Sequence, residues 1–157
     1  MALAILALIA GLSFSSLSPW LTSARRADTE AQFWRSVPPT ELTLQELAAG
    51  GIDLSDTLSV SSDHARFKTY AARLGASPVN VDLAIGHERN GDQLVLTAPD
   101  TRSVLLTGGP PLRFRQQTSA LVLEGDVDGA WTPLAVAPLT TNAPFVCVFD
   151  LISRDCR

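Results

Sequence analysis

The first 24 residues of the chain carry no charged side chain, and this feature constrains the fold more than any other. The segment reads MALAILALIAGLSFSSLSPWLTSA, and the first charged side chain belongs to Arg25. A helix of this length, rising 1.5 Å per residue, extends about 36 Å, which exceeds the roughly 30 Å of a bilayer's hydrocarbon core. The sequence therefore predicts a transmembrane anchor or signal-anchor over residues 1–24.

Large apolar side chains dominate this predicted anchor, and each favours insertion by a few tenths of a kcal/mol. Trp20 lies near the end of the apolar run, where interfacial aromatic residues are common. Arg25 and Arg26 end the run. We assign the membrane anchor to Leu3, Ile5, Leu6, Leu8, Ile9, Leu12, Phe14 and Trp20.

Two other interpretations of this segment stay open. A cleaved signal peptide usually begins with basic residues and ends at a small-x-small site. Here no Lys or Arg precedes Arg25, and cleavage after Ser18 would leave Pro19 directly behind the cut. A buried helix of a soluble core usually has one apolar stripe, whereas apolar residues surround this helix. We therefore favour an uncleaved, single-pass membrane anchor.

Two arguments disagree about the side of the membrane on which the rest of the chain lies. The positive-inside rule counts Arg25, Arg26 and Arg35 after the span and no basic side chain before it, which taken literally predicts a cytoplasmic domain. An N-terminal apolar segment ahead of one globular domain, however, usually serves to export that domain. We expect an extracytoplasmic domain.

The remainder of the chain has the composition of one small, mildly acidic domain. Its 12 basic and 16 acidic residues give a net charge of −4. Non-specific nucleic-acid binding needs a basic face that neutralises phosphates, so nucleic acid is not an expected partner. We divide the 157 residues into an anchor over residues 1–24, a helical neck over residues 25–39 and a β-rich globular domain over residues 40–157.

Short helices are predicted on both sides of residue 40. The neck should end at Pro38 and Pro39, because the residue before a proline is pushed out of helical geometry. Its aromatic pair, Phe33 and Trp34, is a candidate interaction site at the membrane surface or on the domain. Thr43 begins a capping-box sequence, which predicts a separate short helix.

A further amphipathic helix is predicted over residues 62–75. Phe67, Tyr70, Ala71 and Leu74 follow the i, i+3, i+4, i+7 spacing of one helix face, and Gly75 supplies a stop.

From residue 79 onward the period of the apolar residues changes to two. Val79, Val81, Leu83 and Ile85 alternate with polar or small residues, which is typical of one strand with a buried face. Turn pairs such as Asn90-Gly91 and Asp128-Gly129 separate later apolar runs. About six to eight short strands at this spacing predict a mainly β (α+β) fold: an N-terminal transmembrane helix, then a small, closed or nearly closed antiparallel β-barrel or sandwich with one or two short helices.

The sequence contains no recognisable catalytic or metal-binding pattern. The only histidines are His64 and His87, and their neighbours Asp63 and Glu88 should face other directions, because adjacent residues on a strand or helix diverge. The motifs of nucleophile elbows, phosphate loops and metalloproteases are missing from the sequence. We therefore predict no catalytic residue, no metal and no cofactor.

The two cysteines, Cys147 and Cys156, lie near the C-terminus. In an exported domain a disulfide between them would contribute slightly under ~3 kcal/mol through loop entropy. In the cytoplasm both would be free thiols. Their oxidation state would therefore report the side of the membrane on which the domain lies.

The sequence supports two functions. The first is a non-catalytic, single-pass membrane-anchored accessory or scaffolding subunit that binds or assembles other membrane proteins. The alternative is a small-molecule-binding β-barrel or enzyme with a site at the barrel mouth, where Arg113, Arg115, His87 and Glu88 are the nearest polar candidates. We favour the first, because the chain has an apolar N-terminus and an aromatic neck without a catalytic constellation.

Overall fold

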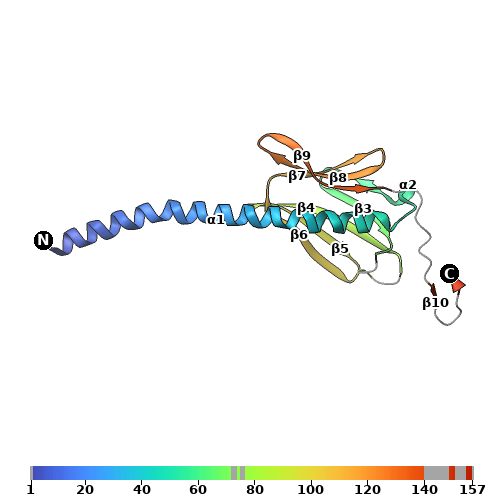
Figure 1. Cartoon of the computed structure of the whole chain (residues 1–157), viewed down its shortest axis with the longest axis horizontal. Coiled ribbons are helices and arrows are strands. Elements are labelled where there is room, and N and C mark those ends of the chain that lie inside the picture. The colour runs from blue at the N-terminus through green and yellow to red at the C-terminus, as the bar shows by residue number, and fades with distance from the viewer. Residues whose placement is uncertain (1, 72–73, 75–76, 140–148, 151–154, 157) are drawn as a thin grey trace.

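A computed structural model shows one long helix and two antiparallel sheets (Figure 1). The structure describes residues 2–71, 74, 77–139, 149–150 and 155–156; for residues 2–19 and the last four of these it describes the backbone alone. The C-terminal half of the helix lies against the sheets and its N-terminal half extends away from them (Figure 1). The predicted β-rich α+β fold is confirmed.

The helix α1 (Ala2–Ala49) has 48 residues and passes through Pro38 and Pro39 without a break. The predicted end of a neck helix at these prolines is therefore wrong, and so is the separate capped helix after them. The Thr43 hydroxyl donates to the Pro39 carbonyl at 2.8 Å and caps no helix start. Burial of Phe33 and Leu47 on either side of the prolines offsets the helical hydrogen bonds that they remove.

The functional division into anchor, neck and domain stays a prediction. Among the residues that the structure describes, no helix is both long and apolar enough to be a candidate membrane span. The side chains of the predicted anchor from Leu3 to Phe14 lie outside the described part of the structure.

The larger sheet has six strands in the order β1-β3-β4-β5-β6, with β2 also paired to β3. A short helix, α2 (Leu54–Thr57), lies between the first two strands. The predicted alternation is confirmed in β4, where Val81, Leu83 and Ile85 are buried. The strands are β1 (Gly51–Ile52), β2 (Ser59–Val60), β3 (His64–Thr69), β4 (Val79–Glu88), β5 (Gly91–Ala98) and β6 (Thr101–Gly109).

A helix is predicted over residues 62–75, and this prediction is wrong for residues 64–69, which form strand β3; residues 72, 73 and 75 lie outside the described part of the chain. Ala65, Phe67 and Thr69 are buried on one face of β3, and the strand pairs with β4 so that Phe67 lies opposite Val81. The segment carries both a helical and a strand period. Pairing with a neighbouring strand decides between them, because it satisfies the backbone and buries Phe67 at once.

The smaller sheet contains β7 (Leu112–Gln117), β8 (Ala120–Val127) and β9 (Ala130–Pro138) in that order. The predicted turn between β8 and β9 is confirmed: Asp128 and Gly129 have φ values of 55° and 80°, as a two-residue hairpin of the primed type requires. The described C-terminal residues form a strand pair, β10 (Phe149–Asp150) with β11 (Asp155–Cys156).

The two sheets enclose one apolar core, and two different seams join them. At the first seam, β7 is tied to the larger sheet through its backbone. The Phe114 amide donates to the Ser62 carbonyl at 2.7 Å, and the Leu112 amide donates to Asp92 Oδ2 at 2.8 Å. The core between the sheets is filled by large side chains such as Leu83, Leu94, Leu106, Leu121 and Leu123.

Helix α1 occupies the second seam, between the edge strands β6 and β9. The Thr40 hydroxyl donates to the Leu105 carbonyl of β6 at 3.0 Å. On the other side, Gln45 Nε2 donates to the Val136 carbonyl of β9 at 3.1 Å, and the Val136 amide donates to Glu41 Oε1 at 3.4 Å. Of the two predicted architectures, the closed barrel is therefore wrong and the sandwich fits, because α1 lies between β6 and β9 and these two strands do not pair with each other.

Candidate functional site

The first candidate site is the part of α1 that projects from the sheets. Every residue from Trp20 to Glu30 is exposed, with 78% of Trp20 and 59% of Leu21 accessible. From Trp20 onward, the first buried residue of the helix is Phe33. The helix before Thr22 projects from the sandwich (Figure 1), and at 1.5 Å per residue, residues 2–21 would extend about 30 Å.

The aromatic pair divides between the core and the surface. Phe33 is 1% exposed and Trp34 is 41% exposed, and their rings meet edge to face with centroids 5.3 Å apart. Phe33 covers Gly109, where a Cβ atom would overlap its ring. Gly108 has a φ of 73° and lies against Thr29. Gly108 and Gly109 therefore let the helix approach the end of β6. An interaction role for Trp34 stays a prediction.

A cleft of about 970 Å³ lies where α1 leaves the sandwich. One wall is α1 from Thr22 to Trp34. The other walls are the β4–β5 hairpin tip at residues 88–90, the end of β6 with the following Pro110 at 107–110, and the β8–β9 tip at 126–128. The charged residues that line the cleft are Arg25, Arg26, Arg89, Glu30, Glu88, Asp126 and Asp128.

We call this space the exit cleft, and much of its charge has no direct partner among the residues that the structure describes. Among the described residues, no hydrogen bond or ion pair is found for the guanidinium groups of Arg25, Arg26 and Arg89. Asp126 Oδ1 is buried without a hydrogen-bond partner in the same part of the structure. Sequence analysis missed this cleft, because its residues lie far apart in the chain and meet only when α1 packs against three loops.

His87 is paired with Asp92 and not with its sequence neighbour Glu88. His87 Nδ1 lies 2.8 Å from Asp92 Oδ1, while Asp92 Oδ2 accepts the Leu112 amide. The hydrogen bond and the charge of Asp92 raise the pKa of His87 above its usual value. Asp92 is buried and holds the start of β7 against β5. The pair therefore stabilises the first seam between the sheets.

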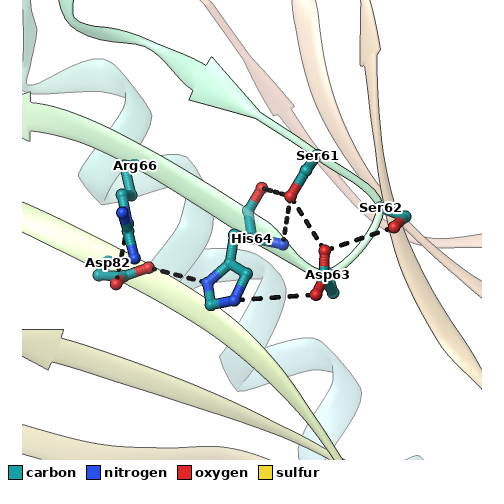
Figure 2. Close-up of polar contacts among 6 residues, drawn as sticks. All are labelled: Ser61, Ser62, Asp63, His64, Arg66 and Asp82. Carbon is teal, nitrogen blue, oxygen red and sulfur yellow. Dashed lines mark hydrogen bonds and ion pairs between the residues drawn. The ribbon is translucent and has the colours of Figure 1, made fainter.

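A cluster of serine, histidine and carboxylate side chains surrounds the turn before β3, and Figure 2 shows its geometry. The Ser61 hydroxyl donates to Asp63 Oδ1 at 3.0 Å and accepts the His64 amide at 3.1 Å. The His64 ring lies between two carboxylates, with Nδ1 3.4 Å from Asp82 Oδ1 and Nε2 3.8 Å from Asp63 Oδ2 (Figure 2). Arg66 Nε donates to Asp82 Oδ2 at 3.0 Å.

This cluster has the residue types of a serine hydrolase without its arrangement. In a hydrolase the imidazole contacts the serine hydroxyl and accepts its proton. Here the Ser61 hydroxyl contacts a carboxylate and the His64 backbone, and the drawn imidazole faces Asp63 and Asp82 (Figure 2). The hydrogen bond from Ser61 lowers the pKa of Asp63. The cluster orders a turn whose Ser62 carbonyl binds β7.

Arg113 and Arg115 lie beside Glu124 of β8. Arg113 Nη2 and Arg115 Nη1 lie 2.7 Å and 3.5 Å from the two oxygens of Glu124, which is 3% exposed. The Arg113 guanidinium also stacks 4.0 Å from the centre of the Trp131 ring. His87 binds Asp92 elsewhere. The structure therefore does not bring the four polar candidates together at a cavity mouth, and apolar side chains fill the space between the sheets.

The remaining predicted features are not decided by the structure. Cys147 lies outside the described residues, and Cys156 is described by its backbone in β11, so the disulfide stays a prediction. Within the described part of the chain, no group of three or more potential ligands could hold a metal ion.

The chain matches no protein-family model, no curated protein and no solved structure. Its function is therefore inferred from its own sequence and geometry.

Proposed function

We propose that the chain is a non-catalytic structural subunit that is held in a membrane by the apolar N-terminal part of α1. This helix binds other membrane proteins and presents the β-sandwich as a head group. The observation that carries the proposal is the continuity of α1: one unbroken helix begins in the apolar segment and ends in the core of the sandwich.

An apolar helix that projects from a domain is stable only if its side chains are buried away from water. Nine Leu, Ile and Phe residues lie between Leu3 and Leu21. Full burial of such side chains is worth about 1.5–3 kcal/mol each, or roughly 14–27 kcal/mol for nine. A bilayer, or apolar helices of other proteins within it, would supply that burial. This gain is larger than the whole folding stability of most domains.

The same segment has the composition of a helix that packs against other helices in a bilayer. Small residues recur at intervals of four, at Ala7, Gly11 and Ser15. Small residues at this spacing let two helix backbones approach closely in membranes, where close packing and hydrogen bonds drive association. We therefore propose another membrane protein as the partner, bound along this helix.

The packed half of α1 fixes the head group to this anchor. Phe33, Leu44 and Leu47 are buried in the core, and Thr40 and Gln45 donate hydrogen bonds to β6 and β9. A head that shares its core with the anchor helix moves with that helix as one body. This construction suits a scaffold or spacer, which must hold its head at a set distance from the membrane.

Membrane anchoring is tested by alkaline carbonate extraction of membranes that contain the full-length chain. We expect the wild-type chain to stay in the membrane pellet. Leu8→Arg combined with Leu12→Arg should release it, because each charge at a helix centre costs about 2.5–3.5 kcal/mol on insertion. The matched control is Leu42→Arg, since Leu42 is exposed on the packed half of α1. Extraction of the wild-type chain by carbonate would contradict anchoring.

Partner binding is tested by chemical cross-linking in intact membranes, followed by identification of the adducts. We expect an adduct with another membrane protein that Gly11→Leu removes without changing carbonate resistance. An anchored wild-type chain that forms no such adduct would contradict the scaffold role.

The proposed extracytoplasmic side is tested separately by titrating thiols under denaturing, non-reducing conditions. We expect Cys147 and Cys156 to be unreactive until a reductant is added. Two reactive thiols before reduction would place the head in the cytoplasm.

A further inference from the structure

We propose that the exit cleft binds the phosphoethanolamine headgroup of a phospholipid, with arginines on the phosphate and carboxylates on the primary amine. This inference rests on the proposed function, because insertion of the apolar segment brings the cleft to the bilayer surface.

The position of the cleft along α1 fits a headgroup. Trp20 is exposed and lies at the end of the apolar segment, where aromatic side chains mark the membrane interface. The cleft wall begins at Thr22, and Arg25 lies about 7.5 Å beyond Trp20 along the helix axis. The cleft therefore lies at headgroup depth when the apolar segment is inserted.

Three guanidinium groups of the cleft are available for a phosphate. Arg25 and Arg26 come from α1, and Arg89 comes from the tip of the β4–β5 hairpin. Among the described residues none of these side chains has an ion-pair partner. Guanidinium groups bind phosphate oxygens through paired hydrogen bonds, and a phosphate would also reduce the repulsion among the three cations.

The carboxylates of the cleft favour a zwitterionic ligand over a purely anionic one. Glu30, Asp126 and Asp128 line the same space as the arginines. Asp126 Oδ1 is buried and receives no hydrogen bond from the described residues, so this oxygen lacks a donor within that part of the chain. A primary ammonium group carries three donors. The quaternary amine of phosphatidylcholine carries none, which predicts a preference for the primary amine.

The size and floor of the cleft are compatible with this ligand. Its volume of about 970 Å³ is at the upper end of the range for small-molecule sites, which leaves room for a headgroup and its bridging waters. Pro110 and the partly exposed Trp34 supply apolar surface beside the charged groups. That surface can contact the glycerol carbons next to the phosphate.

The test is native mass spectrometry of the full-length chain in detergent, titrated with short-chain phosphatidylethanolamine, phosphatidylcholine or phosphatidylglycerol. We expect phosphatidylethanolamine to bind roughly tenfold more tightly than the other two, as one charge-assisted hydrogen bond allows. Asp126→Asn should remove the preference over phosphatidylcholine. Arg25→Gln with Arg26→Gln should weaken all three lipids. Arg102→Gln is the matched control, because Arg102 is exposed near the other end of β6.

The outcomes separate this inference from the proposed function. Equal affinities for the three lipids, unchanged in the Asp126 and arginine variants, would overturn the inference while carbonate resistance still supported anchoring. If free phosphoethanolamine binds as tightly as short-chain phosphatidylethanolamine, the claim that the bound headgroup belongs to a phospholipid is overturned. If thermal unfolding shows that Asp126→Asn destabilises the fold, Asp128→Asn at the exposed hairpin tip replaces it and is expected to reduce the same preference.

Discussion

Substituting Gly109 by alanine should loosen the joint between α1 and the sandwich. A Cβ atom at Gly109 would lie 2.6 Å from Phe33 Cζ and closer still to Cδ2 and Cε2. Carbon atoms in ordinary contact are about 3.5–4.0 Å apart, so the ring must move by at least roughly 1 Å. Phe33 is 1% exposed, so moving its ring disturbs the packing of its neighbours. We expect a loss near the upper end of the usual 1–3 kcal/mol for overpacking, about 3 kcal/mol.

A double-mutant cycle isolates the clash from other effects of the alanine. Phe33→Leu replaces the ring with a smaller apolar side chain and should by itself cost about 1–2 kcal/mol of folding stability. In the Phe33→Leu background, Gly109→Ala should cost about 1 kcal/mol or less, because Cε2 and Cζ are gone and the smaller leucine side chain can rotate its Cδ atoms away. The control is Gly86→Ala, where the nearest atoms, at 3.3 Å, belong to the flexible side chain of Gln93.

The measurement is denaturant or thermal unfolding of the full-length chain in detergent, followed by circular dichroism. For a domain of this size, 3 kcal/mol corresponds to a decrease in Tm of roughly 10 °C. Two results would contradict a clash between Gly109→Ala and Phe33: a Gly109→Ala variant as stable as the wild type, or a cycle in which the two losses simply add.

Three further predictions concern buried charges and their partners. The pKa of His87 is higher in the folded chain than in the unfolded chain, where it is about 6.5. The ion pair of His87 with Asp92 therefore stabilises the fold fully below the unfolded pKa, and this contribution is lost as the pH rises through the folded pKa. The Tm difference between wild type and His87→Gln should therefore be larger at pH 5.5 than at pH 8.5. Asp92→Ala leaves the Leu112 amide without its partner and should cost about 1–3 kcal/mol in chemical denaturation. Glu124→Gln should cost about 2 kcal/mol, less than the loss of a fully buried pair, because the Arg113 side chain remains 34% exposed.

Each of these predictions has a result that contradicts it. A pH-independent difference between wild type and His87→Gln would show that the pair with Asp92 does not couple to folding. Wild-type stability in Asp92→Ala would mean that the Leu112 amide finds water in place of the carboxylate. If Glu124→Gln leaves the denaturation midpoint unchanged, the ion pair of Glu124 with Arg113 contributes no more to folding stability than a surface ion pair.

Local patterns correctly indicated much of the sandwich. The alternation at Val81, Leu83 and Ile85 marks β4, and Asp128-Gly129 marks a hairpin, because both signals depend on a few neighbouring residues. Phe67 shows where such patterns fail. It fits a helix face at one spacing and a strand face at another, and the choice depends on Val81, which lies in a different strand.

The residues that line the exit cleft could not be predicted from the sequence. Arg25 and Arg26 could be read as the end of an apolar segment, but not as the wall of a cleft. Arg89 and Asp126 join them only because α1 passes between hairpin tips that come from distant parts of the chain. The pairing of His87 with Asp92 was missed for a related reason: the two residues face each other across the β4–β5 hairpin.

The sequence alone determined the uncharged apolar segment before Arg25, the alternation of the later strands and the turn at Asp128-Gly129, because hydropathy and backbone preference act over short distances. Only the tertiary structure decided that one helix continues through Pro38 and Pro39 and occupies the seam between the two sheets. The physical reason is that burial against β6 and β9 offsets the local preference of proline to end a helix. That burial depends on strands about 60 to 100 residues further along the chain.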